Sequence, residues 1–71
     1  MSQEADKILE EMIDLQRKKI RRVADELGVH LTGEDILNAH DFPQLIRSSR
    51  FNFEDGYLAG LLAAQMAFRS L

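Results

Sequence analysis

The chain has 71 residues, of which 45% are hydrophobic and 30% are charged, and it contains no cysteine. This composition is typical of a globular protein rather than a disordered one, and it excludes disulfides and thiolate metal sites. The formal net charge of −3 gives no general attraction to nucleic acid or to an anionic membrane.

A long helix is predicted from about residue 2 to residue 27. Its seam residues recur at alternating steps of four and three, as in a coiled coil or a helical bundle. The seam consists of Leu9, Ile13, Gln16, Ile20, Val23 and Leu27. Ser2 is a candidate N-cap. Gly28 stands where a helix ends in the left-handed conformation, and Val29 follows it to make the accompanying apolar contact.

The middle of the chain predicts two short helices. Thr32 is a candidate N-cap followed by acidic residues, and its helix is expected to last one or two turns, to about Ala39. Asp41 is a candidate cap for the next helix, with Pro43 in its first turn and an end near Ser48. The side chains that we expect this second helix to bury are Phe42, Leu45 and Ile46.

A C-terminal helix is predicted with Asn52 as its N-cap. From Tyr57 to Phe68 it is apolar around its whole circumference, whereas a surface helix of a small monomer has one apolar face. Small residues at steps of four form a broad surface on it: Gly56, Gly60 and Ala64, with Ala59, Ala63 and Ala67. Glycine costs roughly 1 kcal/mol relative to alanine inside a helix. The glycines therefore indicate either close approach of another helix or relief of a clash in the chain's own core. Among the aromatic residues, we expect Phe42 and Phe53 in the core and Phe51 and Tyr57 partly buried.

These elements predict one all-α domain over residues 1–71, a small helical bundle completed by dimerisation. A chain this short buries only roughly 60% of the surface that its unfolded form exposes. Small domains add disulfides, a metal or oligomerisation, and oligomerisation is what remains here. We therefore expect a protein–protein association module, a homodimer in its leading form. The residues expected at the interface are Ile13, Ile20, Leu58, Gly60, Leu61, Ala64 and Phe68.

Two other functions stay open. The C-terminal helix would also suit an adaptor that docks into a groove of a larger protein. The basic run from Arg17 to Arg22 is a candidate nucleic-acid surface. Acidic residues flank this run on both sides, so we expect a solvated face instead. If two copies of the first helix packed antiparallel, its acidic half would meet its basic half, and Gln16 would help to fix the register.

We expect no enzyme activity, metal or cofactor. His30 and His40 are ten residues apart and lack the spacing of metal ligands. No nucleophile motif or phosphate-binding loop is present. The N-terminus lacks the regions of a signal peptide, and the longest apolar run, about a dozen residues, is too short to span a bilayer. We therefore expect a cytoplasmic location.

Overall fold

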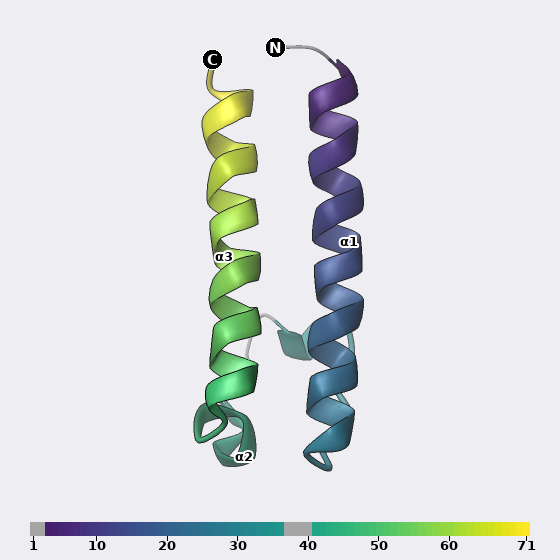
Figure 1. Cartoon of the computed structure of the whole chain (residues 1–71), viewed down its shortest axis with the longest axis vertical. Helices are drawn as coiled ribbons and strands as arrows, with labels where there is room; N and C mark the ends of the chain where they lie inside the picture. The colour runs from purple at the N-terminus through teal and green to yellow at the C-terminus, as the bar shows by residue number, and fades with distance from the viewer. Residues whose placement is uncertain (1–2, 37–40) are drawn as a thin grey trace.

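The computed structural model describes residues 3–36 and 41–71. It confirms an all-α fold whose elements are α1 (Gln3–Glu26), α2 (Pro43–Ile46) and α3 (Ser49–Arg69). Helices α1 and α3 lie side by side and antiparallel, so the start of α1 is beside the end of α3 (Figure 1). Neither described range contains a strand.

The seam predicted for α1 is confirmed over its central part. Ile13, Gln16, Ile20 and Val23 are buried, whereas Leu9 is half-buried and Leu27 is exposed. The buried stripe faces α3, which supplies the partner helix from within the same chain. The proposed cap Ser2 lies outside the described residues.

The end of α1 also follows the prediction. Gly28 has a φ of +82°, in the left-handed region that glycine adopts without strain. Its N–H donates to the carbonyl of Asp25 at 3.0 Å, and the Val29 N–H donates to the carbonyl of Ala24 at 2.9 Å. These two bonds form a Schellman motif, and the Val29 side chain is buried as that motif favours.

Thr32 caps a turn, as its sequence context predicts. Its hydroxyl accepts a hydrogen bond from the Asp35 N–H at 3.3 Å, and the Asp35 carboxylate accepts one from the Thr32 N–H at 3.0 Å. This is a capping box with aspartate in the reaching position. The remainder of that predicted helix, through Leu37 to Ala39, lies outside the described residues.

The prediction for α2 is only partly correct. Phe42, not Asp41, occupies the N-cap position and makes no capping hydrogen bond, while Pro43 begins the helix. Leu45 is fully buried and Phe42 packs against the core, as predicted. Ile46 is exposed, contrary to the prediction, because a helix of one turn can turn only one side toward the core.

The start of α3 differs from the prediction by one turn. Ser48 is the N-cap, and its hydroxyl accepts a hydrogen bond from the Phe51 N–H at 3.1 Å. Asn52 instead lies inside the helix, and its Nδ2 donates to the Ile46 carbonyl at 2.7 Å. The earlier start buries Phe51. Phe53 follows two helical positions later, about 200° around the axis, and is therefore 68% exposed rather than in the core.

The core is concentrated toward the end of the molecule where α2 lies. Its buried apolar residues are Ile13, Ile20, Val23, Ala24, Val29, Leu31, Ile36, Leu45, Phe51 and Leu58. Nearer the other end, the apolar residues between α1 and α3, such as Leu9 and Leu61, are only half-buried. The two long helices are thus packed well at one end and more thinly at the other.

The molecule is elongated for its length. Its extents are 40 × 19 × 16 Å and its radius of gyration is 13.2 Å, against about 11 Å for a compact domain of this size. Its accessible surface is 5117 Å², against about 4,500 Å² for a compact monomer. One copy therefore leaves more surface in water than a chain of this length usually does.

Candidate association surface

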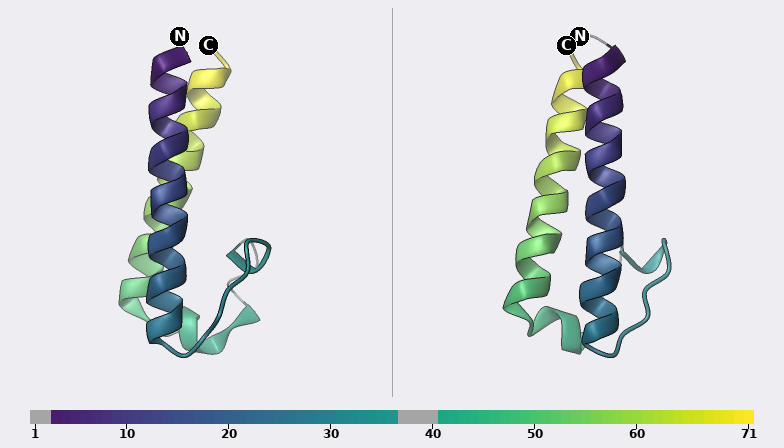
Figure 2. Two further views of the ribbon diagram at one scale, coloured as in Figure 1. Left: turned by 90° about the vertical axis from the view of Figure 1, so that its right-hand side faces the viewer. Right: turned by 45° about the vertical axis from the view of Figure 1, so that its right-hand side comes forward.

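One broad side of the α1–α3 pair is covered over part of its length, near α2, and the other is not (Figure 2). The segment that follows α1 runs out on one side of the pair (Figure 2), where Leu31 and Ile36 enter the core. On the opposite side Met12 and Leu15 of α1 and Tyr57 of α3 border a shallow hollow of about 300 Å³. No described segment lies over these side chains.

We call this uncovered side the open face. Residues three and four apart on a helix share a side, which extends the face along both helices from the hollow. It consists of Ile8, Met12 and Leu15 on α1 and of Phe53, Tyr57, Gly60, Leu61, Ala64 and Phe68 on α3. Most of its large apolar side chains are exposed, Leu15 by 65% and Phe53 by 68%. Exposed apolar side chains gathered on one side of both helices mark a candidate interaction surface.

The residues predicted at an interface divide into two groups. Those on the open face, exposed or half-buried, are Gly60, Leu61, Ala64 and Phe68. Those within the chain's own core are Ile13, Ile20 and Leu58, which are 3%, 0% and 5% exposed. The α1 seam is therefore occupied by α3 of the same chain and is not free for a second copy.

Sequence reasoning missed the α1 half of the open face. Ile8, Met12 and Leu15 follow at steps of four and three, parallel to the seam and one position before it. That second stripe is the signal that could have revealed the face.

The two helical glycines of α3 do not relieve a clash inside the chain. A Cβ placed on Gly56 or on Gly60 would meet no atom of the chain within 4 Å outside its own turn of helix. Both glycines are exposed. The interpretation that they make room in the monomer core is therefore wrong.

A buried polar cluster fixes how α3 lies against α1. Gln16 Nε2 donates to the Glu54 backbone carbonyl at 2.9 Å and to its Oε1 at 3.1 Å. Lys19 Nζ lies 3.0 Å from the other carboxylate oxygen. These bonds, first that of Gln16 and then that of Lys19, lower the pKa of Glu54. These bonds form only when α3 lies at one position along the axis of α1, so the cluster fixes the register of the two helices.

Ion pairs also join α1 and α3 nearer the ends of the helices. Arg69 Nε lies 3.1 Å from Asp6 Oδ1, and Arg69 Nη2 lies 2.9 Å from Glu10 Oε1. The hydrogen bond to Asp6 is the largest cause of the raised pKa of Arg69. At the other end Arg50 pairs with Glu26. Each pair is exposed and adds little stability by itself, but together they agree with the register set by Gln16.

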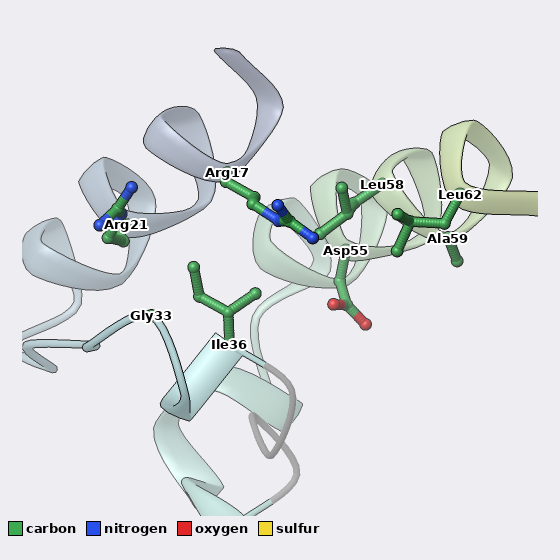
Figure 3. A pocket seen from close by; sticks show the side chains of 8 residues that line it. All are labelled: Arg17, Arg21, Gly33, Ile36, Asp55, Leu58, Ala59 and Leu62. Carbon is green, nitrogen blue, oxygen red and sulfur yellow. The ribbon is translucent and has the colours of Figure 1, made fainter. Parts of the chain in front are cut away.

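The basic run of α1 does not form one continuous surface. Arg17 and Arg21 are half-buried and line a hollow of about 410 Å³ on the covered side, together with Asp55 of α3 and Ile36 (Figure 3). Lys19 is paired with Glu54, and Arg22 borders the hollow of the open face. A phosphate backbone would therefore meet these cations on different sides of the helix.

The described residues hold no group of three or more potential metal-ligating side chains and no helix that could cross a membrane. His30 lies 3.4 Å from Asp25, and His40 lies outside the described residues. Comparison of the chain with protein-family models, with curated proteins and with solved structures finds no match.

Proposed function

We propose that this protein is an association module that forms a homodimer through the open face. The observation that carries the proposal is the row of exposed apolar side chains on the side of α1 and α3 that no described segment covers. Burial of apolar surface is the dominant driving force of association. On this proposal the protein acts by bringing two copies of itself together and has no catalytic activity of its own.

The size of the surface is suited to a stable dimer. The broad side of the molecule measures 40 by 19 Å, or about 760 Å² in projection, close to the roughly 800 Å² that each partner contributes to a standard interface. Two helix pairs packed face to face would make a two-layer bundle of four long helices. Such a bundle would be far less elongated than one copy.

A second copy fits this face for a reason of charge. The exposed edge of α1 beside Ile8 and Leu15 carries Glu4, Lys7 and Glu11 toward the N-terminus and Lys18 further on, so that Glu11 and Lys18 stand on either side of Leu15. A copy turned end for end about the midpoint of Glu11 and Lys18 brings the Glu11 of each copy opposite the Lys18 of the other. Charges arranged in this way select the partner and its orientation.

The test is the mass of the full chain in solution. Sedimentation equilibrium over a range from below one to about a hundred micromolar should give the mass of two chains at the upper concentrations. A mass of one chain at tens of micromolar would overturn the proposal. A chain that stays monomeric alone and binds one larger protein with fixed stoichiometry would identify an adaptor instead.

A further inference from the structure

We infer that the two copies are related by a two-fold axis perpendicular to the long helices. Helix α1 then lies antiparallel on α1 of the second copy, and α3 lies antiparallel on α3. This inference rests on the proposed homodimer. The alternative closed arrangement has its axis parallel to the helices and puts α1 of one copy on α3 of the other.

The order of charges along α1 supports the perpendicular axis. Glu4, Lys7, Glu11, Lys18 and Arg22 lie along the exposed edge beside the open face, and none forms an ion pair in the described structure. The midpoint between Glu11 and Lys18 falls next to Leu15. When a second α1 runs in the opposite direction about that point, each Glu11 faces the Lys18 of the other copy. Were α1 to lie on α3, these charges would meet an edge of α3 that carries Ser49, Phe53, Gly56, Gly60 and alanines and has no charged residue of its own.

The order of side-chain sizes along α3 supports the same axis. At steps of four and three one row of α3 carries Phe53, Tyr57, Gly60, Ala64 and Ala67, which are large before the glycine and small after it. Leu61 and Phe68 of the open face stand in a separate row. Antiparallel packing centred on Gly60 places each Phe53 on Ala67 and each Tyr57 level with Ala63, beside Ala64, of the other copy. Large side chains then fill the space above small ones. The glycines meet where the helix backbones come closest.

The two centres lie at nearly the same height in the molecule. Hydrogen bonds put Gln16 beside Glu54 near one end, and ion pairs put Asp6 and Glu10 beside Arg69 near the other. Interpolation between these contacts places Gly60 level with about residue 13, two residues before Leu15, the centre of the charge order. One axis therefore satisfies both helices, although the two patterns arise from unrelated parts of the sequence.

Cysteine trapping tests this arrangement directly, because the chain has no cysteine of its own. Leu15→Cys places a thiol near the axis and should give a disulfide-linked dimer under mild oxidation. Ala59→Cys is the matched control, since it is exposed at nearly the same height but on the side that borders the covered hollow. It should remain unlinked. The alternative arrangement predicts instead that Leu15→Cys links only when mixed with Tyr57→Cys.

A charge exchange provides a second readout that needs no cross-link. Glu11→Lys and Lys18→Glu should each weaken self-association by several-fold, because each places like charges across the axis twice. An equimolar mixture of the two should restore association as a heterodimer. A wild-type chain that is dimeric while the mixture stays weak and Leu15→Cys stays unlinked would overturn the inference and leave the proposed function standing. A monomeric wild-type chain would overturn both.

Discussion

Replacing Leu15 by glutamine should weaken the dimer without unfolding the helix pair. Full burial of a leucine side chain contributes about 1.5–3 kcal/mol, and Leu15 is 65% exposed in a single copy. Association can therefore gain about 1–2 kcal/mol from this side chain in each copy, or about 2–4 kcal/mol in a symmetric dimer. The loss corresponds to a dissociation constant roughly 30- to 700-fold higher. Leucine and glutamine have similar helix propensities, so α1 itself should persist.

Sedimentation equilibrium gives the dissociation constant, and far-UV circular dichroism verifies the helix content of the variant. Met66→Gln is the control, because Met66 is 70% exposed on α3 outside the open face. We expect it to leave the dissociation constant unchanged. Equal weakening by both substitutions, or none by Leu15→Gln, would mean that the open face is not where two copies meet.

Three further changes have defined outcomes in urea unfolding. Gly28→Ala should lower the free energy of unfolding by about 1–2 kcal/mol because alanine disfavours the left-handed backbone. Gly60→Ala, made in a monomeric background, should raise it by about 1 kcal/mol. A variant of Gly28 more stable than the variant of Gly60 would contradict the geometry of both glycines. Ser48→Ala should cost about 1 kcal/mol through loss of the hydrogen bond from Phe51, and an unchanged midpoint would mean that this cap does not hold α3. The pKa of Glu54 is lowered on folding, so its contribution is present above the ordinary value of 4.5 and is lost as the pH falls from there through the lower folded value. Glu54→Gln should reduce the difference in stability between pH 7 and pH 3, and an unchanged pH dependence would refute this role.

Signals confined to a few neighbouring residues were readable from the sequence. The seam of α1 and its end at Gly28 depend on spacing and on one glycine, and both are confirmed. The same holds for the cap at Thr32, where donor and acceptor are three residues apart. Local chemistry alone decides these features.

The start of α3 could not be decided in that way. Ser48 and Asn52 are both good capping residues, and local preference does not separate them. The start at Ser48 buries Phe51 and brings Glu54 against Gln16, contacts that exist only once α3 has packed on α1. Three residues predicted at an interface, Ile13, Ile20 and Leu58, lie in the core for a related reason. Sequence spacing showed that α1 has an apolar seam, but not that α3 of the same chain would occupy it and leave the stripe at Ile8 exposed.

The uneven core has a consequence for how this molecule opens. Fully buried apolar side chains crowd toward α2, while the far ends of α1 and α3 are joined mainly by Arg69 and its carboxylates. Exposed ion pairs resist fraying weakly, so amide protons near Asp6 should exchange with solvent long before those near Val23. The two long helices should therefore separate first at the end where Asp6 and Arg69 lie, while the end near α2 stays packed. Any partner bound across the separating end would also set how often the helices open there.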